Sequence, residues 1–172
     1  MKKTCLFLTP CLVSANAGEI KLSIEVPRLD VAEYHRPYVA AWLEKADKSH
    51  HANLAVWYDT AMKNEEGEKW LKDLRQWWRK SGRVLNLPMD GMSGPTRPAG
   101  THDFPVPQKT FDPATLAAGD YALVVEASRE VGGREMVRVP FKWDGKSAVS
   151  QAASGKTELG KIAIHIESTS NN

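Results

Sequence analysis

The stretch that decides the fold is residues 119–143, GDYALVVEASREVGGREMVRVPFKW. One strand is expected from Gly119 through Ser128, and a second from Glu135 to Trp143. Between them lies the run Val131-Gly132-Gly133-Arg134, whose glycines suit a tight turn. The sequence therefore predicts a β-hairpin in the last third of the chain.

Outward from this hairpin, four more segments are expected to be strands. In 19–27, apolar residues alternate with polar ones, which is typical of a half-buried strand. The segments 37–45 and 53–59 carry apolar residues on both faces, so both should be covered on two sides. Residues 161–167 complete the series, and the small, polar residues of 144–157 are expected to form a long surface loop.

The segment 68–80 breaks the pattern of alternation. Its large apolar residues recur at i, i+1, i+4, i+7 and i+8, which predicts an amphipathic helix ended by Ser81-Gly82. Trp70 and one of the adjacent pair Trp77 and Trp78 are expected to belong to the core. Strands on both sides of a single helix predict a mostly β fold, an immunoglobulin-like antiparallel β-sandwich with one inserted amphipathic helix.

The first 17 residues resemble a secretory signal peptide. Lys2 and Lys3 form a basic start, a short apolar stretch follows, and Ala15-Asn16-Ala17 is a cleavage site. Residues 18–167 are then expected to form a single domain, with 168–172 as a disordered polar tail. These features predict a periplasmic or otherwise extracytoplasmic location.

Charge and cysteine content exclude several classes of protein. The whole chain has 23 Lys and Arg against 21 Asp and Glu, and cleavage after Ala17 would leave 21 of each. A neutral protein is a poor nucleic-acid binder, so no nucleic-acid partner is expected. Cys5 and Cys11 would both leave with the signal peptide. No later stretch approaches the roughly 18 apolar residues of a membrane span, so the mature protein should not be membrane-embedded.

The most informative run for chemistry is Asp90-Gly91-Met92-Ser93-Gly94-Pro95-Thr96. It resembles the motif on which bacterial flavin transferases esterify FMN to a threonine hydroxyl. The resemblance implies that Thr96 carries covalent FMN and that Asp90, Gly91, Ser93 and Gly94 are recognised by the transferase.

The motif departs from the usual pattern at one position. Pro95 stands where such motifs usually have Ala or Ser, and proline restricts the backbone of the residue before it. The structural alternative for the whole run is a plain turn, since Asp, Gly, Ser and Pro are all turn formers.

The wider sequence resembles a family of small periplasmic proteins, the domain of unknown function numbered twenty-two seventy-one. The resemblance rests on the following runs: His35-Arg36-Pro37-Tyr38-Val39, Ala55-Val56-Trp57-Tyr58, Lys69 to Trp78, Ser93 to Gly100, Gly119-Asp120-Tyr121, Glu126 to Glu130 and Gly132-Gly133. It implies an immunoglobulin-like sandwich that occurs with flavin transferases and with PepSY-type membrane reductases linked to iron acquisition.

Further cofactor contacts are predicted from residue type. Whichever of Trp77 and Trp78 is outside the core can stack on a flavin ring. Arg75, Arg79 and Arg97 can stabilise the negative charge of reduced flavin. The alternatives are an aromatic stripe that belongs entirely to the core and ordinary solvated arginines.

Metal binding and catalysis by side chains have little support. The five histidines show no metal-binding spacing, and His50-His51 is expected in a polar turn between strands. The adjacent Glu65-Glu66 pair is expected to be solvated, and no nucleophile–base pattern occurs. No metal and no catalytic residue are therefore expected.

Two functions remain open from the sequence. The first is an extracytoplasmic electron-transfer protein with covalent FMN, modified by a flavin transferase and serving a PepSY-type membrane reductase linked to iron acquisition. The second is a cofactor-free periplasmic accessory or binding module for a reductase, a transporter, or an iron or haem ligand.

Overall fold

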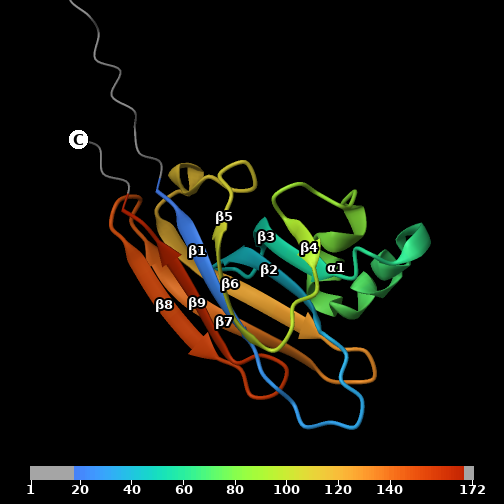
Figure 1. Cartoon of the computed structure of the whole chain (residues 1–172). Coiled ribbons are helices and arrows are strands. Elements are labelled where there is room, and N and C mark those ends of the chain that lie inside the picture. Colours follow the sequence, from blue (N-terminus) through green and yellow to red (C-terminus); the bar gives the residue numbers. More distant parts are fainter. Residues whose placement is uncertain (1–17, 169–172) are drawn as a thin grey trace, which may run out of the picture.

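Two β-sheets packed face to face make up residues 18–168, the part of the chain that this computed structural model describes (Figure 1). The first sheet has the strand order β5-β1-β9-β8 and the second β4-β3-β2-β6-β7. The strands are β1 Ile20–Val26, β2 Tyr38–Lys45, β3 His50–Tyr58, β4 Ser93–Pro95, β5 Gly100–Val106, β6 Gly119–Ser128, β7 Arg134–Trp143, β8 Val149–Ser154 and β9 Lys161–Ile166. Only β3 and β4 pair in parallel, so the prediction of a mostly β, antiparallel sandwich is confirmed.

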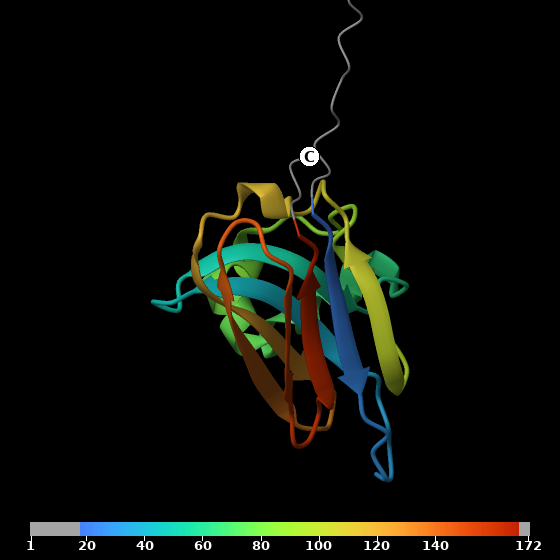
Figure 2. The ribbon, with the colours of Figure 1, turned by 90° about the vertical axis from the view of Figure 1, so that its left-hand side faces the viewer.

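The space between the sheets is filled by the apolar residues of alternating strands. Every second residue of β1, from Ile20 to Val26, is buried there, as are the three isoleucines of β9. Figure 2 shows the first sheet in front, with β2 and β3 crossing behind it. β1 and β9 are antiparallel neighbours, and the Glu167 N–H donates to the Glu19 carbonyl (2.9 Å). The two ends of the described chain therefore lie side by side, at the upper left of Figure 1.

The middle of the second sheet is buried on both of its faces. The predicted hairpin is confirmed as β6 and β7, which pair from Gly119↔Trp143 to Ser128↔Arg134. In β2, Leu43 faces the inter-sheet core, while Trp42 belongs to a second apolar cluster on the outer face. The expectation that the segments 37–45 and 53–59 are covered on two sides is thus correct, since the middle of β3 is buried in the same way.

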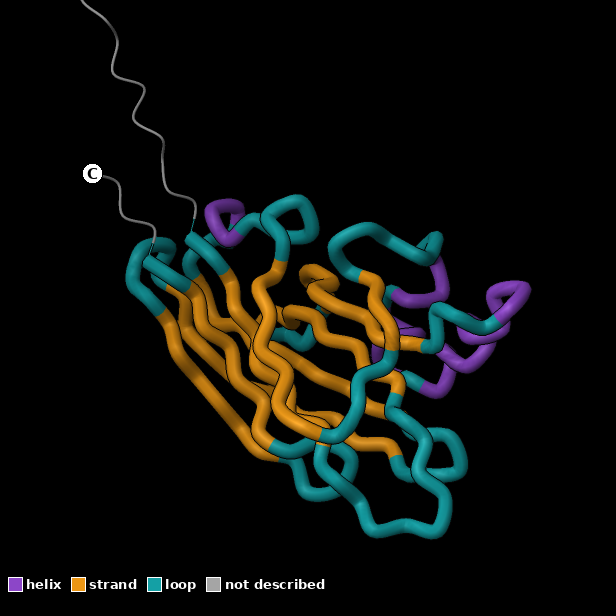
Figure 3. Tube along the Cα trace, viewed as in Figure 1, coloured by secondary structure: helices purple, strands orange, loops and turns teal. Residues whose placement is uncertain are grey.

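The outer face of the second sheet is covered by the segment between β3 and β4, residues 59–92, called the cover below. It contains two 3₁₀ segments, η1 Lys63–Asp73 and η2 Gly82–Val84, and the helix α1 Arg75–Lys80. Figure 3 shows these helical turns together on one side of the sheets. Another short 3₁₀ turn, η3 Pro113–Thr115, lies in the β5–β6 connection. No helix of the described residues is long and apolar enough to cross a membrane.

The predicted helix over 68–80 is correct only in its last turns. The helical conformation is interrupted at Leu74, where ψ is 68°, and α1 begins at the next residue. The reason is a side chain of the sheet: the buried carboxylate of Glu126 accepts hydrogen bonds from the backbone N–H groups of Gln76 (3.0 Å) and Trp77 (2.9 Å). Because the first N–H groups of a helix lack partners within it, this anchor sets where α1 starts.

Two predictions about loops are wrong. The expected loop 144–157 contains β8, an edge strand whose side chains are mostly exposed, so it lacks the apolar alternation of a half-buried strand. His50 and His51 lie in β3 rather than in a turn, and the His51 ring packs against Phe111 and Tyr121. Burial lowers the pKa of His51.

The predicted signal peptide, residues 1–17, lies outside the described residues, and of the predicted tail only Ser168 is described.

Candidate functional site

The predicted acceptor run folds as a tight turn followed by an edge strand. The Met89 carbonyl accepts from Ser93 N (2.8 Å), and the Ser93 hydroxyl accepts from Met89 N (2.9 Å), which closes the turn. Gly91 has φ +79°, and a Cβ there would lie 2.7 Å from Thr110 Oγ1, so this position requires glycine. The exposed Asp90 pairs with Lys109, which lowers the pKa of the Asp90 carboxyl. The structural alternative of a turn therefore describes the first half of the run only.

The second half of the run is β4, which lies parallel to β3. Gly94 is the partner of Trp57 in this register, and Pro95 is the partner of Tyr58. The pairing continues one residue further, because Thr96 N–H donates to the Tyr58 carbonyl (3.1 Å). Thr96 is thus fixed by its backbone to the end of β3 while its side chain remains half-buried.

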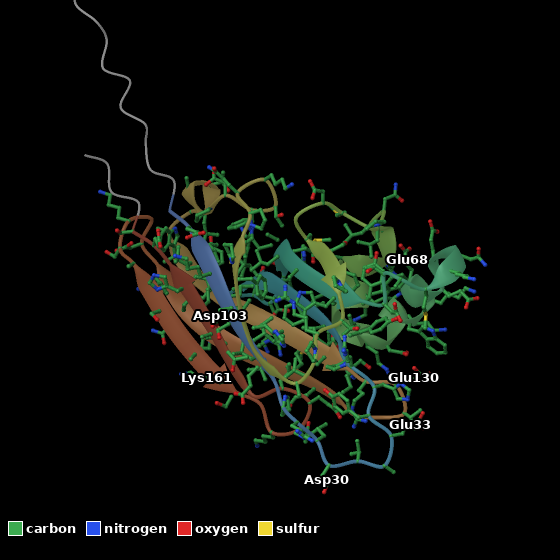
Figure 4. The ribbon with its side chains drawn as sticks, in the orientation of Figure 1. Asp30, Glu33, Glu68, Asp103, Glu130 and Lys161 are labelled. Atoms are coloured by element: carbon green, nitrogen blue, oxygen red, sulfur yellow. The ribbon has the colours of Figure 1, made fainter. Side chains whose placement is uncertain are left out.

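A cavity of about 480 Å³ opens beside Thr96. Its walls come from the loop before β2, the chain that follows β3, η1, the end of β4 and the end of β6. In Figure 4, Glu130 of this rim lies next to Glu33 at the lower right, and Glu68 of η1 lies above them. Small-molecule sites usually have volumes of about 300–1,000 Å³. The cavity is therefore large enough to hold an organic ligand at Thr96.

Aromatic side chains form part of the cavity wall. Trp70 of η1 is 46% exposed and Tyr34 is 37% exposed. Tyr38, the first residue of β2, is half-buried. Lys72 Nζ lies 5.9 Å from the Trp70 ring. Burial raises the pKa of both tyrosines, so their phenols are neutral at ordinary pH. This part of the wall therefore presents aromatic rings with neutral phenols.

Charged groups lie around this wall. His35 is held between two carboxylates, with Nε2 3.1 Å from Glu33 and Nδ1 3.7 Å from Glu130. The Asp59 carboxylate accepts from Ala61 N (3.1 Å) at the end of β3. Arg36 lines the cavity as well, and it forms no ion pair with any described residue. The cavity therefore offers an anionic group one unpaired guanidinium, that of Arg36, beside the carboxylates of Asp59, Asp73 and Glu130.

Arg97, the residue after Thr96, is half-buried and contacts aromatic rings of the sandwich. Its guanidinium carbon lies 4.4 Å from the centre of the Trp57 ring and 5.1 Å from that of Phe104. Burial lowers its pKa. Arg97 does not line the cavity, and neither do the exposed Arg75 and Arg79 of α1. Its contacts hold the acceptor segment against the sandwich, and the predicted contact with reduced flavin stays a prediction.

The tryptophans are arranged differently from the sequence prediction. Trp77 is 0% exposed and donates from its indole N–H to Asn53 Oδ1 (2.8 Å), which confirms one core member. Trp70 was expected in the core as well, and this is wrong, because the break at Leu74 turns η1 out of register with α1. The half-buried Trp78 packs against the apolar cluster of the outer face and does not line the cavity, so its predicted contact with the flavin ring stays a prediction.

The sequence prediction missed most of the cavity. Tyr34 and Arg36 precede β2, whereas Asp59 and Trp70 follow β3, and the fold of the second sheet brings both stretches to Thr96. The exposed Trp70 results from the break at Leu74, for which no local sequence pattern gives a signal. No group of three or more His, Cys, Asp or Glu in residues 18–168 is placed to hold a metal ion.

Comparison with known proteins gives one match. The model of a family described as "Predicted periplasmic protein (DUF2271)" matches residues 19–161, which include every strand of both sheets except β9, of which only Lys161 falls within the match. No curated protein and no solved structure matches the chain.

Proposed function

The chain belongs to this family of predicted periplasmic proteins, and on that premise we propose that it is an extracytoplasmic electron-transfer protein with FMN esterified to Thr96. The periplasmic description agrees with the extracytoplasmic location expected from the sequence. The flavin would accept and pass on electrons, while the chain supplies anchorage, local charge and a surface for redox partners. The proposed partners are a flavin transferase and a PepSY-type membrane reductase linked to iron acquisition.

The observation that carries the proposal is the position of Thr96. The acceptor of the motif lies on the wall of a cavity whose other walls offer aromatic rings and an unpaired arginine. The residues present therefore fit a flavin, which is a flat aromatic group joined to an anionic phosphate. A plain surface turn would explain the motif residues, but it would not explain a cavity at the acceptor position.

The attachment reaction needs FAD and a transferase. The Thr96 hydroxyl oxygen would bond to the phosphorus of the FMN half of FAD, and the bond from that phosphorus to the bridging oxygen would break. AMP leaves with the bridging oxygen, and a base of the transferase takes the hydroxyl proton. A phosphodiester between threonine and flavin results, with no oxidation or reduction.

The test is coexpression with a flavin transferase, followed by intact mass and flavin fluorescence on a denaturing gel. The parent chain is expected to gain the mass of one FMN less one water, with the label on the Thr96 peptide. Thr96→Ala should lose the label and keep its fold, because a half-exposed hydroxyl contributes little to stability. Thr96→Ser keeps the hydroxyl and should retain some label.

A matched control variant replaces Pro95, the one residue that departs from the usual motif. Pro95→Ala restores a small residue and removes the restriction on Gly94, so it should be labelled faster than the parent if proline slows the transferase. An unlabelled parent under conditions that modify a known acceptor would refute the proposal. The cofactor-free accessory or binding module would then be the better explanation.

A further inference from the structure

We propose that the flavin ring carried by Thr96 lies inside the cavity, against the exposed indole of Trp70. This inference rests on the proposed function and names the side chain that receives the ring. Of the chain's six tryptophans, all within the described residues, Trp70 alone is exposed. A large aromatic side chain left in solvent on the wall of a cavity is the kind of surface that binds a flat ligand.

The backbone holds Trp70 and Thr96 at the same place. Thr96 N–H is bonded to the carbonyl of Tyr58, the last residue of β3. The next residue, Asp59, is in close backbone contact with Gly67 of η1, where a Cβ would lie 1.9 Å from the Asp59 carbonyl oxygen. The backbones of both walls are therefore held by two consecutive residues, Tyr58 and Asp59.

The chemistry of the wall suits an isoalloxazine ring. An electron-poor ring stacks favourably on an electron-rich indole, and Tyr34 offers a second exposed aromatic edge. Arg36 can approach the anionic pyrimidine side of the reduced ring, since no described carboxylate pairs with it. The short ribityl chain between phosphate and ring lets the ring fold from Thr96 into the cavity.

The measurement is the fluorescence yield per bound flavin in the intact, flavinylated chain. Contact with an indole quenches flavin fluorescence, so the parent should emit several-fold less than free FMN at equal flavin absorbance. Trp70→Leu should raise the yield by at least about twofold, because the stacked ring is lost. Trp70→Tyr keeps an aromatic, electron-rich ring and should remain quenched. Trp78→Leu, on α1 and outside the cavity, is the matched control and should leave the yield unchanged.

Mass and fluorescence together separate the two proposals. A chain with no added mass refutes the proposed function and this inference with it. A chain with the full mass and equal yields in the parent and Trp70→Leu refutes this inference alone. A rise in Trp78→Leu without a rise in Trp70→Leu would place the ring on α1 and would refute it as well.

Discussion

The space between the two sheets and the cover on the outer face of the second sheet are held together in different ways. The inter-sheet core is made of apolar side chains from strands whose burial alternates along the sequence. The cover, residues 59–92, also contributes apolar side chains, but it is positioned by polar groups of the sheet, the buried Glu126 and the half-buried Asn53. Glu126 binds the start of α1, and Asn53 accepts from both Trp77 and Ser81.

The difference teaches what a sequence pattern can specify. Apolar alternation fixes which face of a strand is buried, because a one-residue shift would expose the whole set. A short irregular cover has no such period, so single hydrogen bonds decide where its helix begins. The cover also forms one wall of the cavity through Trp70, so the site depends on the part that the pattern specifies least.

The largest effect should come from the apolar part of the cover. Trp77→Ala removes a fully buried indole and should lower the free energy of unfolding by about 3–5 kcal/mol. Trp70→Ala, seven residues earlier, should change it by less than about 0.5 kcal/mol, as is usual for surface sites. Urea unfolding followed by circular dichroism measures both. Equal losses in the two variants would mean that η1 is packed as tightly as α1.

The next effect should come from the polar anchor of α1. Glu126→Ala leaves the N–H groups of Gln76 and Trp77 without their acceptor and should cost about 2–3 kcal/mol. Arg134, the ion-pair partner of Glu126, is 38% exposed, so water can partly replace it and Arg134→Ala should cost less than Glu126→Ala. Amide hydrogen exchange should show the loss first in residues 75–80. Unchanged protection there would contradict the view that Glu126 sets the start of the helix.

A smaller, pH-dependent effect is expected at Glu44. Burial alone would raise the pKa of this carboxyl, but hydrogen bonds from Arg138, Lys80 and Trp42 together lower it below its ordinary value of 4.5. Because the pKa is lowered in the folded state, the stabilisation is complete above about pH 4.5 and is lost as the pH falls through the folded-state value.

Glu44→Gln should therefore cost about 1–2 kcal/mol near pH 7 and progressively less in acid. Urea unfolding of parent and variant from about pH 7 down to about pH 3 measures this difference. Lys80 belongs to α1, so the same carboxylate links the cover to the sheet. A constant difference between the two proteins across this range would show that the charge of Glu44 contributes nothing.

The smallest effect should come from the cation–π contacts beside the acceptor. Arg97→Ala removes the guanidinium from Trp57 and Phe104 and should cost about 0.5–1 kcal/mol. The exposed Arg83 is a matched control, and Arg83→Ala should stay within about 0.5 kcal/mol. Thermal unfolding is sensitive enough to compare them. Identical melting curves for the two variants would mean that Arg97 does not hold the segment.

Most strands could be predicted from the sequence because their apolar residues alternate or flank a glycine turn, whereas β4, β5 and β8 were missed. The β6–β7 hairpin, β1 and β9 were all identified by apolar alternation or by a glycine turn. β8 was missed because its exposed, small side chains have no such signal. β4 was missed as a strand because it has only three residues and pairs in parallel with a strand far away in the chain.

The candidate site could be predicted only at its acceptor. Thr96 belongs to a contiguous motif, and such a motif is visible without any structure. The partner side chains Arg36 and Trp70 reach the cavity through the topology of the second sheet and through the break at Leu74. Neither depends on the residues next to them in the chain, so no local pattern could have assigned them to the same site.

The side-by-side ends of the described chain have a practical consequence for anything fastened to them. Residues 18 and 168 leave from the upper left of Figure 1, whereas η1 and β4, which line the cavity, lie at the right. A surface, a neighbouring domain or an electrode linker attached at either end would lie on the side of the sandwich away from the cavity. The face around Thr96 would then point outward, so an immobilised molecule would present its cavity to the solution in one orientation.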